Sequence, residues 1–547
     1  MKANRLAVAF AGLLLCSAPA FATPPSSSAS SAQASPEKND QSESLIQKLS
    51  KPLSSTTHGT VTVGGKAISY EAVAGTLVLD GTGVDEGTPE VAMSYVAYFK
   101  QSADPSKRPV TFIYNGGPGS STVWLHMGAW GPQRIVTKDD THTPAAPYQL
   151  VNNDCSLLDA SDLVFIDMPG AGFGRLLSQG KNEGERAKSR KQLAKEYWGI
   201  DGDAQAFSRF ITQFLSRYNR WNSPKFLLGE SYGTARSAVL SNVLQTQYNV
   251  DLNGVMLLSA ILDFGSNVNS AEANPGNDLP YVLALPTYAA TAWYHHKLSK
   301  YGAGQLGKLL SDTITFARDE YHDALFAGST LSPQKKREVA EKLHDLIGLP
   351  VAYVLQANLR VTGGMFAQEL RTGSGVTISR LDTRFSGPAM DPLDKEADYD
   401  PQSAAINSAY ISAFNNYVRN DLKFGEGMQY RPSARAAGDF GWDFKRRPPG
   451  AGFASSGVNV MGDLAAAMKY NPNLKVMMAG GLYDLVTTFY TATYELEHLS
   501  IPESLRKNIS YAFFPSGHMI YAHLPSLKQL HDDVAAFIEA NDNQGSK

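Results

Sequence analysis

Residues 226–233 read Phe226-Leu227-Leu228-Gly229-Glu230-Ser231-Tyr232-Gly233. An apolar, strand-like run leads directly into the pattern G-x-S-x-G, and a sequence compatible with a helix follows. In that context the pattern is typical of a nucleophile elbow, a sharp turn that exposes a serine at the end of a strand. The pattern alone is weak because the chain has 47 glycines. An ordinary strand-to-helix turn is the alternative, but the placement favours Ser231 as a nucleophile.

Strand-like and helical patterns alternate on both sides of this stretch. The predicted strands are residues 109–114, 163–166, 226–228, 255–258, 476–478 and 509–514, preceded by antiparallel hairpins at 60–63 and 74–79. Residues 201–218 carry apolar side chains at helical spacing, and residues 525–540 suit a closing helix. This alternation predicts an α/β protein with a mostly parallel sheet.

Between about residues 263 and 457 the alternation lapses into helical, aromatic-rich and Pro/Gly-broken stretches. We interpret this segment as an inserted, mainly helical cap domain and expect an α/β-hydrolase fold. The hydrolase core then consists of residues 51–262 and 458–547. Residues 1–22 are the predicted signal peptide, and residues 23–50 are a predicted flexible, low-complexity linker rich in Ser, Ala and Pro.

The first residues have the features of a secretory signal peptide. Lys2 and Arg5 precede an apolar run at 6–15, and an A-x-A cleavage signature stands at 20–22. A membrane anchor needs about 20 apolar residues, more than the chain has before Pro19. A lipoprotein at Cys16 is a further alternative, disfavoured by a bulky leucine just before it. We expect export to the periplasm or the medium, without stable membrane insertion.

Net charge and the absence of certain motifs argue against several classes of ligand. The formal net charge of −3 and the pI near 6.4 argue against binding to nucleic acid. The sequence has no H-E-x-x-H, C-x-x-C or Walker motif, so we expect no metal and no cofactor. If Cys16 is removed with the leader, Cys155 cannot form an intramolecular disulfide, and a buried packing role is expected for it. The sequence leaves the oligomeric state open.

A serine hydroxyl needs a base to remove its proton and a carboxylate to orient that base. In α/β hydrolases the chain order is serine, acid, histidine. Asp484 and His518 both follow predicted strands and glycine turns, and we predict the triad Ser231, Asp484 and His518. Each residue alone is more often structural. His523 is a rival base, but no glycine turn precedes it.

The glycine loop that starts at Asn115 provides candidate donors for an oxyanion. The loop follows the strand 109–114 and contains Gly116 and Gly117. We expect the backbone amides of Gly117 and Tyr232, the residue after the nucleophile, to form the oxyanion hole.

Several blocks in this order resemble the serine carboxypeptidase family. The resemblance covers most of the predicted core and little of the cap, and it identifies the chain as an exported bacterial member of the family. Residues 115–121, followed by Gly131-Pro132, correspond to the family's N-G-G-P-G-C-S-S...G-P. Residues 167–173 correspond to its D-x-P-x-G-x-G-F with one residue fewer. The other blocks are residues 229–232, residues 481–484, and residues 517–519 with Pro525 beyond.

The resemblance implies removal of C-terminal residues from peptides through an acyl-enzyme. It also implies that Asn115 and Glu230 hold the terminal carboxylate of the peptide substrate. Because two carboxylates repel each other unless one is protonated, we expect peptidase activity to be best below neutral pH.

The sequence departs from the family at four points. The family's second glutamate is replaced by Ala129, a tryptophan by Ile113 and the loop cysteine by Ser120, and the family's disulfides are absent. An esterase or acyltransferase that uses the same triad is therefore an alternative. A catalytically inactive binding protein is a further alternative, which the intact triad disfavours.

Overall fold

The computed structural model describes residues 44–448 and 457–543. The predicted signal peptide, Cys16 and most of the predicted linker lie outside these residues. At the end of the predicted linker, residues 44–49 are helical and Leu49 is buried. Within the described ranges, no helix is long and apolar enough to cross a membrane.

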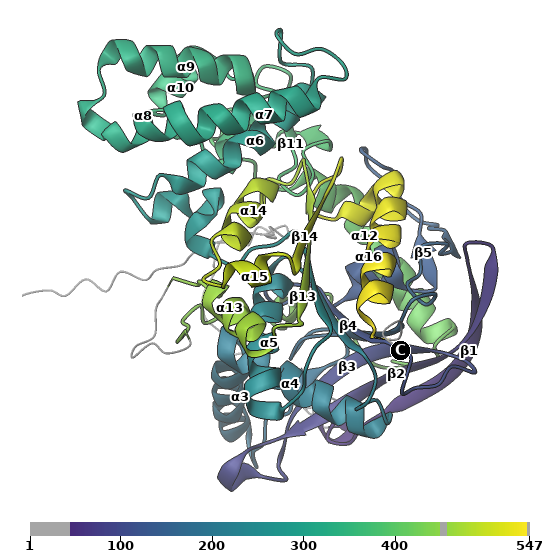
Figure 1. The fold of residues 1–547 in the computed structure, drawn as a ribbon. Coiled ribbons are helices and arrows are strands. Elements are labelled where there is room, and N and C mark those ends of the chain that lie inside the picture. The colour runs from purple at the N-terminus through teal and green to yellow at the C-terminus, as the bar shows by residue number, and fades with distance from the viewer. Residues whose placement is uncertain (1–43, 449–456, 544–547) are drawn as a thin grey trace, which may run out of the picture.

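A ten-stranded sheet forms the centre of the molecule (Figure 1). Its strands are β1 (Ser54–Val63), β2 (Lys66–Asp80), β3 (Pro89–Lys100), β4 (Val110–Tyr114), β7 (Asp162–Ile166), β8 (Arg175–Leu176), β9 (Lys225–Glu230), β10 (Gly254–Leu258), β13 (Lys475–Gly481) and β14 (Ile509–Phe514). The order is β1-β2-β3-β7-β4-β9-β10-β13-β14, and β8 pairs with β3. Strands β7 to β14 in this order are all parallel. The predicted mostly parallel α/β sheet is confirmed.

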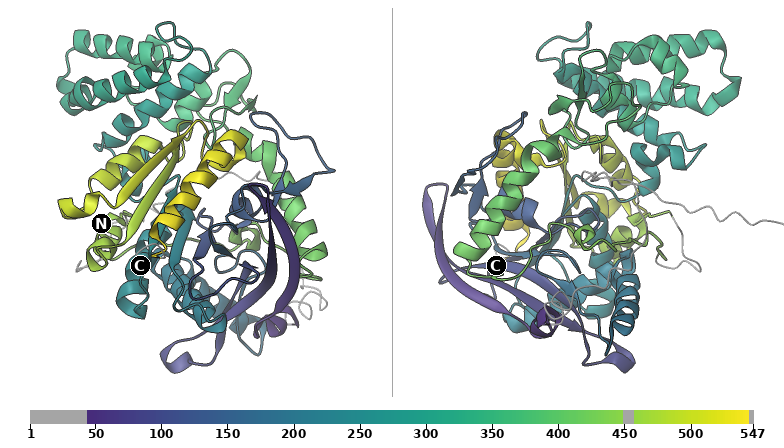
Figure 2. Two further views of the ribbon diagram at one scale, coloured as in Figure 1. Left: turned by 45° about the vertical axis from the view of Figure 1, so that its right-hand side comes forward. Right: turned by 180° about the vertical axis from the view of Figure 1, so that it is seen from behind.

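Helices cover both faces of the sheet, because alternate residues of each buried strand point to opposite sides. On one face, Phe112, Leu227 and Val255 join a core with the helices α3 (Glu183–Tyr197), α4 (Ile200–Arg217), α5 (Tyr232–Tyr248), α13 (Met461–Tyr470) and α14 (Phe489–Glu497). On the other face, Ile113 and Leu228 join a core with α2 (Val123–Leu125), α12 (Pro401–Asn420) and α16 (Leu524–Asn541). The short α15 (Glu503–Arg506) precedes β14. Figure 2 shows this layered arrangement from two further sides.

The segment predicted as a cap contributes to two regions. A set of helices with its own apolar core lies beyond one end of the sheet (Figure 1): α6 (Leu279–Tyr294), α7 (Leu306–Phe316), α8 (His322–Ala327), α9 (Pro333–Ile347), α10 (Val351–Gln356) and α11 (Gly363–Glu369). A small hairpin of β11 (Val376–Ile378) and β12 (Ser386–Pro388) follows. By contrast, α12 packs on the sheet itself. The domain boundaries at 263 and 457 stay a prediction.

The remaining small sheet pairs β5 (Gln133–Ile135) with β6 (Leu150–Asn152). Because β4, β9, β13 and β14 are parallel, their carboxyl ends meet at one edge of the large sheet. Loops at this edge carry the candidate residues, as is usual for open α/β sheets.

Candidate active site

Ser231 stands on a strained turn between β9 and α5. Its backbone has φ 60° and ψ −130°, a conformation that non-glycine residues rarely adopt. A side chain at Gly229 would place its Cβ 2.2 Å from the carbonyl oxygen of Gly233, so the turn requires glycine there. The Ser231 amide donates to the carbonyl of Leu258 at 3.0 Å, which ties the elbow to β10. The predicted nucleophile elbow therefore has the backbone geometry that such a turn needs.

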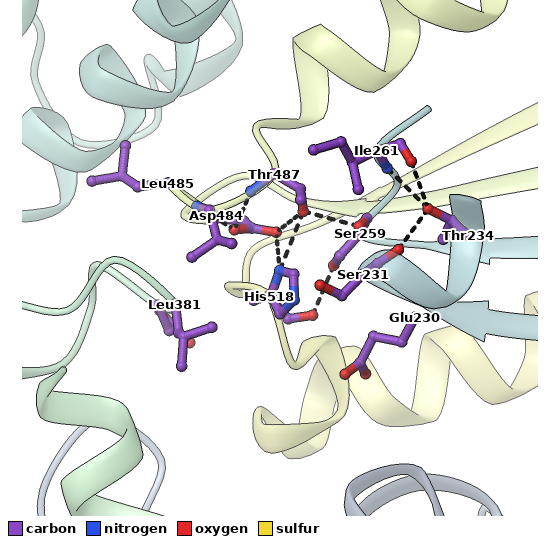
Figure 3. Close-up of polar contacts among 12 residues, drawn as sticks. Glu230, Ser231, Thr234, Ser259, Ile261, Leu381, Asp484, Leu485, Thr487 and His518 are labelled. Carbon is purple, nitrogen blue, oxygen red and sulfur yellow. Dashed lines mark hydrogen bonds and ion pairs between the residues drawn. The ribbon is translucent and has the colours of Figure 1, made fainter. Parts of the chain in front are cut away.

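Asp484 and His518 are joined by a short hydrogen bond. The distance from His518 Nδ1 to Asp484 Oδ2 is 2.8 Å, and both side chains are buried. Asp484 follows β13 and His518 follows β14. Figure 3 shows the side chain of Ser231 pointing toward the His518 ring. The structure thus brings together three side chains that are distant in the sequence.

The carboxylate of Asp484 is held by its own loop. Oδ1 accepts hydrogen bonds from the amides of Val486 at 2.8 Å and Thr487 at 3.0 Å. The Thr487 hydroxyl donates to Oδ2 at 2.8 Å or to the carbonyl of Ser259 at 2.9 Å. These contacts fix the face that the carboxylate presents to His518. Thr487 was not predicted from the sequence, although a threonine three residues after the acid was a usable signal.

His518 is anchored through its backbone by two other segments. Its amide donates to the carbonyl of Leu381 at 2.6 Å, and its carbonyl accepts from the Ser259 hydroxyl at 2.7 Å. Burial opposes protonation of the ring, but the adjacent Asp484 carboxylate outweighs it, so the pKa of His518 is raised. A base with a raised pKa accepts a proton more readily.

The rival histidine has different partners. His523 Nδ1 lies 2.7 Å from the Ser526 hydroxyl at the start of α16, and Nε2 lies 3.7 Å from Asp139. Burial and the nearby Arg384 lower its pKa. The geometry therefore favours His518 as the base.

The glycine loop packs directly against the elbow. A Cβ at Gly116 would lie 2.5 Å from the amide nitrogen of Tyr232, so only glycine allows this approach. Gly117 has φ 110°. Among described residues, the amides of Gly117 and Tyr232 find no hydrogen-bond acceptor. Tyr232 is also the first residue of α5, whose dipole favours negative charge at this end. Both amides are available to an oxyanion.

Asn115 and Glu230 form a buried pair beside the elbow. The side-chain amide of Asn115 donates to Glu230 Oε1 at 2.8 Å, and its own oxygen accepts from the Leu125 amide at 3.1 Å. Burial raises the pKa of Glu230 to about 7, against the lowering influence of His518, Tyr521 and Asn115. Glu230 Oε2 and the Tyr521 hydroxyl are buried, and neither makes a hydrogen bond of normal geometry within the described part of the chain.

A second network behind the elbow was missed by the sequence analysis. Arg236 of α5 forms two hydrogen bonds with Asp203 of α4 and donates to the carbonyl of Asn115 at 2.8 Å. The only sequence signal was an aspartate inside the apolar pattern of residues 201–218. Such a residue is as often exposed at a helix end.

Two further expectations concern metal binding and Cys155. Within residues 44–448 and 457–543, no group of three or more His, Cys, Asp or Glu side chains is arranged to hold a metal ion. Cys155 is buried, as expected of a packing residue. Ala129, at the position of the missing glutamate, is also buried.

Parts of the chain are similar to known proteins. Residues 84–334 match the family described as serine carboxypeptidase. Serine carboxypeptidase-like 34 from Arabidopsis thaliana is 26% identical over 179 residues, which are 30% of this chain and 31% of that protein. Serine carboxypeptidase-like 45 from the same plant is 24% identical over 231 residues, 40% and 44% of the two chains. The chain thus matches less than half the length of these curated relatives.

Among solved structures, a prohormone-processing carboxypeptidase from Saccharomyces cerevisiae, Kex1(delta)p, superimposes with a TM-score of 0.51. The match covers 87% of this chain and 93% of that one at 14% identity. At this identity the likeness shows the fold, which is that of an α/β hydrolase.

Proposed function

We propose that this chain is a serine carboxypeptidase that removes C-terminal residues from peptides through an acyl-enzyme. The observation that carries the proposal is the Asp484–His518 hydrogen bond beside the Ser231 elbow, with the Asn115–Glu230 pair next to it. The family match over residues 84–334 supports the same activity.

The reaction follows from the positions of these groups. His518 takes the proton of Ser231 as the hydroxyl oxygen attacks the scissile carbonyl, and Asp484 keeps the ring oriented and stabilises its positive charge. The amides of Gly117 and Tyr232 donate to the oxyanion. His518 then gives its proton to the leaving amine, and the acyl-enzyme forms. Water, activated by the same histidine, releases the shortened peptide and restores Ser231.

Glu230 and Asn115 select substrates with a free terminal carboxylate. With a pKa of about 7, Glu230 is protonated in acid and can donate to a carboxylate instead of repelling it. Among the described residues Oε2 makes no hydrogen bond of normal geometry, which supports this assignment because a buried polar atom without such a bond is costly unless a ligand supplies one.

A screen of blocked dipeptides with different terminal residues tests the activity. We expect hydrolysis of the free acid, much slower hydrolysis of the matching C-terminal amide, and none by Ser231→Ala. Equal rates for acid and amide would contradict the role of Asn115 and Glu230.

The second candidate is an esterase or acyltransferase with the same triad, which Ala129 favours because it removes a carboxylate from the expected clamp. A simple ester that outperforms every dipeptide would support it. Failure of a fluorophosphonate to label Ser231 would instead indicate an inactive binding protein.

We also propose that the protein is exported to the periplasm or the medium after removal of residues 1–22. The charged, apolar and A-x-A segments support this. N-terminal sequencing of the protein purified from whole culture tests it, and a chain that retains Met1 inside the cell would contradict it.

A further inference from the structure

A buried ion pair lies directly behind the candidate oxyanion hole. The Arg236 and Asp203 side chains are both 0% exposed. Arg236 Nε donates to Asp203 Oδ2 at 2.6 Å, and Nη2 donates to Oδ1 at 3.2 Å. The pair therefore joins α4 to α5 with the two-point geometry that a guanidinium and a carboxylate allow.

The third nitrogen of the guanidinium reaches the glycine loop. Arg236 Nη1 donates at 2.8 Å to the carbonyl of Asn115, the residue before Gly116 and Gly117. This carbonyl belongs to the peptide group that joins Asn115 to Gly116, so its position sets the orientation of the loop that follows. Arg236 thus connects the loop that carries one oxyanion donor to the helix that begins with the other.

Asp203 contacts the second donor residue as well. The Tyr232 hydroxyl donates to Asp203 Oδ2 at 3.3 Å. The guanidinium also lies 4.2 Å from the ring centre of Phe207 and 5.2 Å from those of Tyr114 and Tyr232. These rings leave Arg236 little freedom to move. Both candidate donor residues, Gly117 through its loop and Tyr232 through its side chain, are tied to one ion pair.

Stability alone is a poor explanation for this arrangement. Removing two charges from water is costly, and well-packed apolar residues are often as stabilising as a buried ion pair. Apolar side chains, however, cannot direct a hydrogen bond to the Asn115 carbonyl. Oxyanion stabilisation depends on donors that are already in place before the reaction starts.

We infer that Arg236 and Asp203 are positioning residues, which hold the Gly117 and Tyr232 amides at the spacing that a tetrahedral oxyanion requires. They act through the backbone and touch no reacting atom. The inference rests on the proposed serine-hydrolase chemistry of Ser231, but not on whether the substrate is a peptide or an ester.

The sharpest test removes the whole pair. In Asp203→Leu/Arg236→Met no uncompensated charge is left in the core, so we expect a folded protein with a Tm close to that of the parent. We expect kcat on an activated ester to fall about 10- to 100-fold with little change in KM, because small misplacements of catalytic groups have effects of this size. A peptide aldehyde, whose adduct carries an oxyanion, should lose affinity by a similar factor.

The chain offers a matched control at the opposite end of β4. Arg220 and Asp162 form another buried pair at 2.5 Å, and Arg220 likewise donates to a backbone carbonyl, that of Arg108, at 2.7 Å. Asp162 also pairs with Arg108 at 3.2 Å, so the control replaces all three charged side chains. Arg108→Met/Asp162→Leu/Arg220→Met should leave kcat close to that of the parent. An equal loss of kcat in this triple variant and in Asp203→Leu/Arg236→Met would assign the effect to general loosening and overturn the inference.

Hydrogen exchange gives a readout that does not depend on catalysis. Amides of residues 115–119 should exchange faster in Asp203→Leu/Arg236→Met than in the parent or the control. Unchanged exchange there, or an unchanged kcat, would overturn the inference. If the parent fails to react with a fluorophosphonate, the proposed function fails, while the exchange result still decides whether the pair holds the loop. Arg236→Lys, which keeps the charge but not the fork, should recover only part of kcat.

Discussion

The side-chain amide of Asn115 donates to Glu230 Oε1 at 2.8 Å, while Glu230 Oε2 makes no hydrogen bond of normal geometry with a described residue. One carboxylate oxygen is thus held in place, and under the proposed function the other contacts the terminal carboxylate of the substrate. Because burial raises the pKa of this carboxyl to about 7, its proton is lost near neutral pH.

Substrate binding by Glu230 should depend on pH. Below a pH of about 7 the carboxyl is protonated and attracts a terminal carboxylate; above it, ionised Glu230 repels the substrate. For a free-acid dipeptide, kcat/KM should then fall by about tenfold for each further pH unit. Glu230→Gln should abolish this fall. An ester without a carboxylate is the control, and a fall of the same size for the ester would contradict the prediction.

The acidic side of the profile should report His518. The pKa of the ring is raised, so protonation disables the base at a higher pH than for an ordinary histidine. The rate should therefore decline in acid for peptide and ester alike, which limits the acidic optimum expected from Glu230 to the pH range in which His518 is still neutral. His518→Gln should be inactive, whereas His523→Gln should retain most of the activity because its partners are Ser526 and Asp139. Ester assays of the purified variants distinguish the two histidines.

Substitutions in the loop around Asp484 should lower kcat when they remove a contact with the carboxylate that orients His518. Asp484→Asn should lower kcat by about 10⁴-fold, as loss of a triad carboxylate does elsewhere. Thr487→Val removes a hydroxyl that contacts Oδ2 and should lower kcat by about tenfold, with KM unchanged. Thr488→Val is the control, since its hydroxyl pairs with Thr491 instead. Equal effects of the two threonine variants would argue against orientation by Thr487.

Gly116 should tolerate no side chain. A Cβ there meets the Tyr232 nitrogen at 2.5 Å, so Gly116→Ala must displace the loop or the elbow. We expect kcat to fall by at least about 100-fold, comparable to the loss of an oxyanion donor. Gly441→Ala, where a Cβ has no neighbour within 4 Å among the described residues, should be silent. Thermal unfolding of both variants checks that the Gly116 effect is local.

The parallel sheet could be predicted from sequence because its strands are short apolar runs bounded by glycine, proline and asparagine. For this reason the predicted strand 226–228 lies within β9, and the predicted strand 509–514 is the whole of β14. The triad could be proposed because its members follow strands in a fixed chain order. Local sequence pattern was therefore sufficient to predict strands, and the loops after them, whose limits are set by their own residues.

What could not be predicted depends on long-range packing. The placement of α12 on the sheet rests on contacts with segments hundreds of residues away, and its amphipathic pattern is the same for a cap helix. The Arg236 bond to the Asn115 carbonyl spans 121 residues and involves a backbone atom, which has no sequence signature. The Ser259 contact with the His518 carbonyl was hidden for the same reason.

The amide of His518 is held at 2.6 Å by the carbonyl of Leu381, which belongs to the stretch between β11 and β12. The predicted cap segment and the candidate base are therefore joined by a backbone hydrogen bond. Replacing residues 263–457 with a foreign sequence would remove this carbonyl, so the new segment would have to supply another acceptor for the His518 amide. Without this acceptor, a folded chimera would keep Ser231 in place but would lose the orientation of His518.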